Sequence, residues 1–175
     1  RGTLLLITQL TFRLRPVPET SVRMMLTADS WDAVYSRLDA LAAGSTQPAV
    51  LEVVREDLRD NARPAAAITL EGLTETVEWQ ASEVMRAVRG DGAVLGKVND
   101  TPRLPRTGDV ELVLHTLPAA TSDTLRYLEM SGWRGAAAAY PAEGRIVSRF
   151  TAYPDSAGKV CELREWLEAR GGVLT

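Results

Sequence analysis

Hydrophobic residues recur along the chain with two periods, one typical of strands and one typical of helices. Between residues 20 and 28, Met24 and Leu26 alternate with Arg23 and Thr27, which predicts a half-buried strand. Residues 31–42 instead carry apolar side chains at helical spacing, between an Asp-Ser capping pair and a terminating glycine. The same patterns predict helices at 29–43, 73–89, 121–131 and 157–170, and strands at 20–28, 49–55, 64–71, 94–98, 110–116, 133–140, 145–152 and 173–175.

The order strand, helix, strand, strand, helix occurs twice, in 20–98 and in 110–175, and a strand or the start of one follows each copy. That order is typical of a ferredoxin-like unit, in which helices cover one face of an antiparallel sheet. The sequence therefore predicts an α+β fold of two tandem ferredoxin-like units that form a mainly antiparallel sheet. Because several strands carry apolar residues on both faces, we expect the uncovered face to pack against a partner.

The first residues of the chain also have a strand pattern. An apolar run at residues 4–7 leads into an alternating segment, and Pro16 and Pro18 end it. Nothing precedes this strand for it to pair with. We therefore expect residues 1–19 to be the terminal strand of a domain that comes before residues 20–175.

Residues 2–8 (GTLLLIT) and 11–18 (TFRLRPVP) resemble the segment that ends the flavin domain in FAD-linked oxidases of the vanillyl-alcohol-oxidase type. Within that family the likeness is greatest to the FAD-binding subunit of bacterial glycolate oxidases. Leu5 stands where the family has its second glycine, which bears on any close backbone approach there. The resemblance implies that residues 1–19 end an FAD-binding domain, that 20–175 form the cap (substrate) domain, and that Gly2, Thr3 and Ile7 lie at the cofactor.

The resemblance also implies an activity. The family would oxidise a small 2-hydroxy acid such as glycolate by hydride transfer to the flavin, and FAD would be bound mainly by the missing domain. The implied partners are the substrate, that FAD domain and other oxidase subunits, and the chain alone would be inactive. The alternative is a non-catalytic tandem ferredoxin-like module for ligand binding or assembly, because a fold does not fix a function.

The candidate site residues are polar side chains on strands. His115 is the single histidine, and strand alternation places it opposite Leu114, on the uncovered face, where it could act in catalysis. Arg149 and Arg145 would share that face, and a guanidinium binds a carboxylate through two parallel hydrogen bonds. Tyr140 could add a hydroxyl as a third substrate-binding group. The alternative for each is a surface, salt-bridged or packing role.

Arg23 and Arg55 are further candidates for the same face.

The net charge and the counts of particular residue types serve mainly to exclude classes of function. A net charge of −3 gives no electrostatic case for nucleic acid or an anionic membrane. One histidine and one cysteine make a zinc site of the usual composition improbable and exclude an intrachain disulfide. Cys161 is expected to be buried or half-buried, and a single cysteine fits a reducing, cytoplasmic compartment. The four tryptophans are expected to serve core or interface packing, and no apolar run is long enough to span a bilayer.

Overall fold

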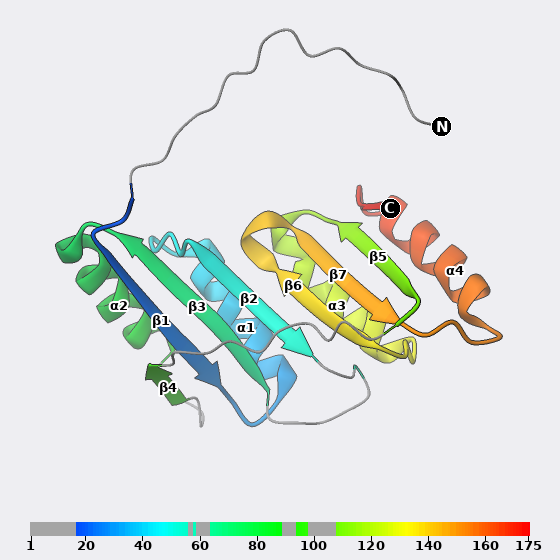
Figure 1. The fold of residues 1–175 in the computed structure, drawn as a ribbon, viewed down its shortest axis with the longest axis horizontal. Helices are drawn as coiled ribbons and strands as arrows, with labels where there is room; N and C mark the ends of the chain where they lie inside the picture. Colours follow the sequence, from blue (N-terminus) through cyan, green and yellow to red (C-terminus); the bar gives the residue numbers. More distant parts are fainter. Residues whose placement is uncertain (1–16, 56–57, 59–63, 89–93, 98–107) are drawn as a thin grey trace, which may run out of the picture.

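The computed structural model describes residues 17–55, 58, 64–88, 94–97 and 108–175. It has the predicted α+β fold, with eight strands in one antiparallel sheet and four α-helices (Figure 1). The strands are β1 Thr20–Thr27, β2 Val50–Arg55, β3 Ala65–Gly72, β4 Val94–Lys97, β5 Val110–His115, β6 Ala136–Tyr140, β7 Arg145–Phe150 and β8 Val173–Leu174. The helices are α1 Trp31–Ala43, α2 Thr74–Val88, α3 Thr121–Met130 and α4 Ser156–Glu168, with short 3-10 helices at η1 Pro118–Ala120 and η2 Pro141–Glu143.

The strand order shows two copies of one topology. The sheet runs β4-β1-β3-β2-β6-β7-β5-β8, so β4-β1-β3-β2 is repeated, read from the other edge, as β8-β5-β7-β6. We call β1–β4 with α1 and α2 unit 1, and β5–β8 with α3 and α4 unit 2. Each unit has the ferredoxin-like order predicted from the sequence. The units join at one seam, where β2 pairs with β6 in the register Val53–Ala139, Val54–Ala138 and Arg55–Ala137.

The hydrophobic core lies between the sheet and the helices, which all cover the same face (Figure 1). Every second residue of β1, β5 and β7 points into it because side chains alternate along a strand. We call the opposite sheet face the open face, since no described helix lies on it. The core includes Met24, Leu26, Leu112, Leu114, Ile146 and Phe150 from strands, and Val34, Leu38, Val77, Val84, Leu125, Leu128, Leu163 and Leu167 from helices.

Local sequence explains two of the element boundaries. Ser30 caps α1, and its hydroxyl oxygen accepts a hydrogen bond from the Ala33 N–H at 3.2 Å. Gly144 ends the tight connection from β6 to β7 with φ at +61°. A Cβ atom there would lie 2.1 Å from the carbonyl oxygen of Thr116, so both the conformation and the space require glycine.

One packing expectation is wrong. Cys161 is exposed, because it lies about 200° around α4 from the buried Leu163. Trp79 is not part of the core: it is 49% exposed, since its neighbours Val77 and Gln80 supply the buried face of α2, and interface packing stays the prediction for it.

The other tryptophans do pack. Trp31 is buried, and the buried Trp133 donates its indole N–H to the hydroxyl of Ser148 at 3.0 Å. Trp166 stacks on Tyr127 with 4.2 Å between ring centroids. Three of the four tryptophans therefore serve the packing that the sequence predicts.

Candidate functional site

An apolar band crosses the middle of the open face. Strand register aligns small or β-branched side chains from one strand to the next, so this part of the face has no long side chain. A surface of this shape is suited to contact with a flat partner. The band consists of Thr27, Ala65, Val54, Ala138, Val147 and Val113.

A polar row borders this band, and it brings three of the predicted site residues together. Tyr140 lies directly opposite Arg145 in the β6–β7 pairing, and Arg145 lies directly opposite His115 in the β5–β7 pairing. The guanidinium of Arg145 stands over the Tyr140 ring, 4.3 Å from its centroid, and forms an ion pair with Glu143 at 3.0 Å. His115 is exposed. Side chains directly opposite one another share a face, so all three lie on the open face, as alternation predicts for His115 and Arg145.

Glu52 extends the polar row across the seam into unit 1. It lies one position along β2 from the Val53–Ala139 pair, and its side chain is only 14% exposed. Burial raises the pKa of Tyr140, and the charge of Glu52 and the hydrogen bond that the phenol donates to it raise that pKa further. Tyr140 therefore stays protonated at neutral pH and acts as a hydrogen-bond donor. The Arg23 guanidinium, also on the open face as expected, lies 3.7 Å from the Glu52 carboxylate.

Arg149 shares the open face but lies apart from the polar row. Four residues along β7 separate it from Arg145, which corresponds to about 13 Å. It lies opposite Glu111 on β5 and forms an ion pair with it at 2.5 Å. The two arginines are thus held by different carboxylates, Arg145 by Glu143 and Arg149 by Glu111.

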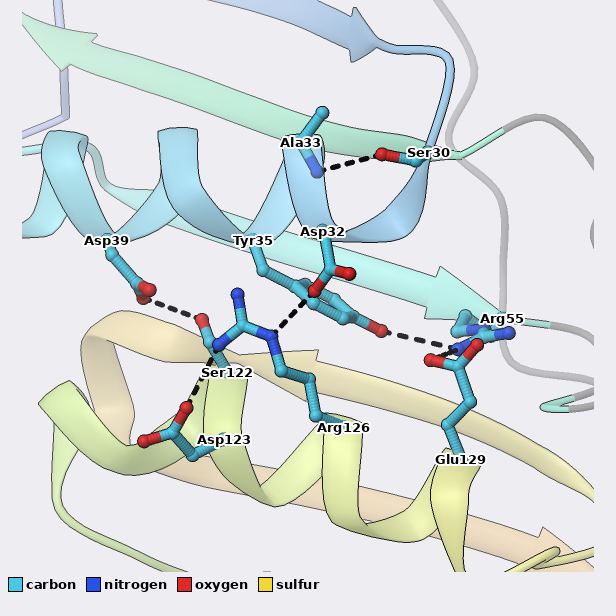
Figure 2. A network of polar contacts seen from close by, with 10 residues as sticks. All are labelled: Ser30, Asp32, Ala33, Tyr35, Asp39, Arg55, Ser122, Asp123, Arg126 and Glu129. Atoms are coloured by element: carbon cyan, nitrogen blue, oxygen red, sulfur yellow. Dashed lines mark hydrogen bonds and ion pairs between the residues drawn. The ribbon is translucent and has the colours of Figure 1, made fainter.

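Arg55 is not on the open face, so this expectation is wrong. Its guanidinium is on the helix side of the sheet, and the residue is 2% exposed. It donates to Glu129 at 2.9 Å and to the Tyr35 hydroxyl at 3.4 Å (Figure 2). It also donates to the carbonyl oxygen of Leu58 at 2.8 Å. A buried guanidinium requires such partners, and the carboxylate of Glu129 supplies the counter-charge.

Further polar contacts join α1 of unit 1 to α3 of unit 2 (Figure 2). The Arg126 guanidinium forms ion pairs with Asp32 at 2.8 Å and Asp123 at 2.9 Å. The Ser122 hydroxyl donates to Asp39 at 2.6 Å. The contacts with Asp32 and Asp39 join residues more than 80 positions apart in the chain, so no local sequence pattern announces them.

Two cavities lie elsewhere on the molecule. A groove of about 650 Å³ lies at the start of β1, between Pro18, Pro48 and Leu73. A smaller one of about 350 Å³ lies beside the first turn of α1, next to Trp31. Neither is lined by a residue of the polar row.

Other site expectations concern the cofactor, metals and membranes. Gly2, Thr3 and Ile7, the predicted cofactor contacts, fall outside the described residues. The described part of the chain holds no group of three or more His, Cys, Asp or Glu residues that could bind a metal ion. None of its helices is both long and apolar enough to cross a membrane.

Comparisons with known proteins show a likeness in fold. No family model and no curated protein matches the sequence. Among solved structures, the chain is similar to alkyldihydroxyacetonephosphate synthase in two crystal forms, with TM-scores of 0.53 and 0.50 and 11% identity in each. The matches cover 91% and 90% of this chain but only 41% and 40% of those chains. The chain thus shares the fold of part of alkyldihydroxyacetonephosphate synthase.

Proposed function

We propose that this chain is the substrate-side cap domain of an FAD-dependent oxidoreductase that oxidises a small 2-hydroxy acid such as glycolate. The observation that carries the proposal is the fold likeness, which extends over nine tenths of this chain and two fifths of an FAD-linked oxidase family enzyme. The resemblance of residues 2–18 to the end of a flavin domain supports the same assignment. Residues 1–19 would then end the FAD domain, and 20–175 would be the cap.

The open face is better suited to pack against a flavin than to be exposed to solvent. Its apolar band offers small side chains, such as those of Val54, Ala65 and Val147, to a flat aromatic ring. FAD would be held mainly by the preceding domain, with Gly2 and Thr3 among its contacts. When bound, the flavin would supply the hydride acceptor, which is chemistry that protein side chains lack.

The polar row supplies groups suited to a 2-hydroxy acid. Arg145 would hold the substrate carboxylate, and the protonated Tyr140 would donate a second hydrogen bond to it by releasing the one that it gives to Glu52. His115, opposite Arg145, would accept the proton of the substrate hydroxyl. Arg149 would contribute a positive charge at the rim, since it lies outside the polar row and is paired with Glu111. This division of roles requires a covering domain, because the row does not line either described cavity.

A non-catalytic module for ligand binding or assembly is the second candidate. The ion pairs Arg145–Glu143 and Arg149–Glu111 favour it, because each arginine already has a carboxylate partner. A substrate would have to compete with these partners. In exposed pairs the net attraction is small, about 0–1 kcal/mol, so such competition is feasible.

The test is anaerobic flavin reduction in the full-length polypeptide that contains this chain. We expect the purified protein to carry FAD and the visible flavin absorbance to bleach when a small 2-hydroxy acid is added. Matched acids that lack the 2-hydroxyl group, such as acetate, should leave the spectrum unchanged. A full-length protein without flavin would support the non-catalytic module instead.

A further inference from the structure

The polar row is assembled from both units. Glu52 and Arg23 come from unit 1, whereas Tyr140, Arg145 and His115 come from unit 2. The geometry of the row therefore depends on how β2 meets β6. We propose that Arg55 is a positioning residue for this row, because its buried contacts across the seam hold β2 in register with β6 and so keep Glu52 beside Tyr140. The consequence for substrate rests on the proposed function, but the positioning itself does not.

The seam has little side-chain packing of its own. Strand β6 begins with four consecutive alanines, residues 136–139, all of them buried. Alanine side chains are too short to interdigitate with those of a neighbouring strand, so they specify register weakly. On the helix side, Ala137 lies directly opposite Arg55 in the pairing. The long side chain of Arg55 therefore lies beside a short one at this point of the seam.

Arg55 joins the two units through its guanidinium. Within unit 1 it donates to the carbonyl oxygen of Leu58 and the hydroxyl of Tyr35, and it stands 4.4 Å from the centroid of the Trp31 ring. Its partner in unit 2 is Glu129 on α3, at 2.9 Å (Figure 2). One side chain at the end of β2 therefore contacts α1, α3 and Leu58 at once.

A charged group at this position is directional in a way that an apolar one is not. The guanidinium is planar and its donors point in fixed directions, so Glu129, Tyr35 and Leu58 can be satisfied together in only a narrow range of seam geometries. An apolar side chain of equal volume would tolerate small shifts of β2 along β6. Buried polar groups can specify one arrangement in this manner even when they add little stability.

Tyr140 reports on the seam from the other side of the sheet. The pKa of its phenol is raised by burial and by Glu52, which lies across the seam. The other charges acting on the phenol are Arg145 on β7, which lowers its pKa, and Glu143 on η2, which raises it; both belong to unit 2. Of these three charged residues only Glu52 belongs to unit 1, so loss of register would move it away from the phenol and leave the other two in place. The pKa of Tyr140 should then fall toward its ordinary value of 10.0.

The experiment compares Arg55→Met with Arg126→Met in the full-length protein. Methionine keeps most of the side-chain volume of Arg55 and removes the directional contacts. Arg126 is the matched control, because it also joins α3 to α1 by ion pairs but is not buried, with 31% of its side chain exposed. The phenol of Tyr140 is titrated by NMR of carbon-labelled tyrosine and assigned with Tyr140→Phe. The KM and kcat for the 2-hydroxy acid are measured in parallel.

For Arg55→Met we expect a lower Tyr140 pKa and a KM raised about tenfold, with kcat changed less than about twofold. Arg55→Lys should restore part of both effects, and Arg126→Met should produce neither. An unchanged Tyr140 pKa in folded Arg55→Met would overturn the positioning role. If that variant does not fold, Glu129→Gln removes the counter-charge with little change in shape, and the same titration decides.

The two readouts separate this inference from the proposed function. A wild-type protein that does not oxidise 2-hydroxy acids contradicts the proposed function, while the titration of Tyr140 still tests the seam. A lowered Tyr140 pKa with an unchanged KM would refute the claim that the row positions substrate. An equal effect in Arg126→Met would also overturn the proposal, because any loss of α1–α3 contact would then suffice.

Discussion

Removing the guanidinium of Arg145 should weaken substrate binding far more than removing that of Arg149. A charge-assisted hydrogen bond is worth about 1.5–3 kcal/mol, which corresponds to a change in affinity of roughly ten- to a hundredfold. Arg145 is 38% exposed and already paired with Glu143, so solvent screening places Arg145→Ala near the lower end, at about a tenfold rise in KM. Arg149 lies outside the polar row, about 13 Å along the β7 backbone, and is paired with Glu111, so Arg149→Ala should change KM less than about threefold.

The assay is steady-state kinetics of the two alanine variants in the full-length protein, with KM and kcat measured separately. Neither change opens a cavity in the core, so the melting temperatures should stay close to that of the wild type. The reasoning would be refuted if Arg149→Ala raised KM tenfold and Arg145→Ala did not. Equal, small effects in both would mean that neither arginine holds the carboxylate.

Three other predictions concern the fold. Gly144→Ala should destabilise the protein by about 1–3 kcal/mol in chemical denaturation, because its φ is +61° and the new Cβ would meet the Thr116 carbonyl. Ser148→Ala should cost about 1–3 kcal/mol, because the buried indole N–H of Trp133 would lose its acceptor. Cys161, which is exposed, should react with a thiol reagent in the native protein as fast as in the denatured one.

Each of these has a control and a contradicting outcome. Gly158→Ala on α4 is the control for Gly144→Ala, since nothing lies within 4 Å of its Cβ position and it should not destabilise. Ser82→Ala on the exposed side of α2 is the control for Ser148→Ala. Equal stability losses within either pair would contradict the assigned contacts. Strong protection of Cys161 from the reagent would contradict its exposed position.

Strand period predicts much of the site correctly. In β5 and β7 the large apolar residues alternate with polar ones, so the face of His115, Arg145 and Arg149 follows from the sequence. In β6 four consecutive alanines remove the alternation, so the sequence does not predict which residues of that strand point toward the core. Helix positions are also well predicted, because caps and glycines mark their ends. All four α-helices begin and end within two residues of the predicted bounds.

Arg55 shows where reasoning from charge fails. The period of β2 places it with Leu51 and Val53, toward the core, whereas its charge favours solvent. The Arg55 side chain points toward the core, as the period predicts, because Glu129 supplies a counter-charge from 74 residues further along the chain. Pairings at that separation, like the β2–β6 seam itself, leave no local trace in the sequence. The ion pair of the buried Arg55 with Glu129, and the site's construction from two units, therefore emerge only from the structure.

The most direct test of the cap-domain assignment is an experimental structure of the full-length protein with FAD and oxalate, a non-reacting analogue of a small 2-hydroxy acid. The assignment predicts that the flavin ring lies against the open face, over the band that includes Val54, Ala138 and Val147. It also predicts that the oxalate carboxylate lies within hydrogen-bonding distance of Arg145 and Tyr140. An open face that meets solvent or another subunit, with the flavin elsewhere, would contradict it.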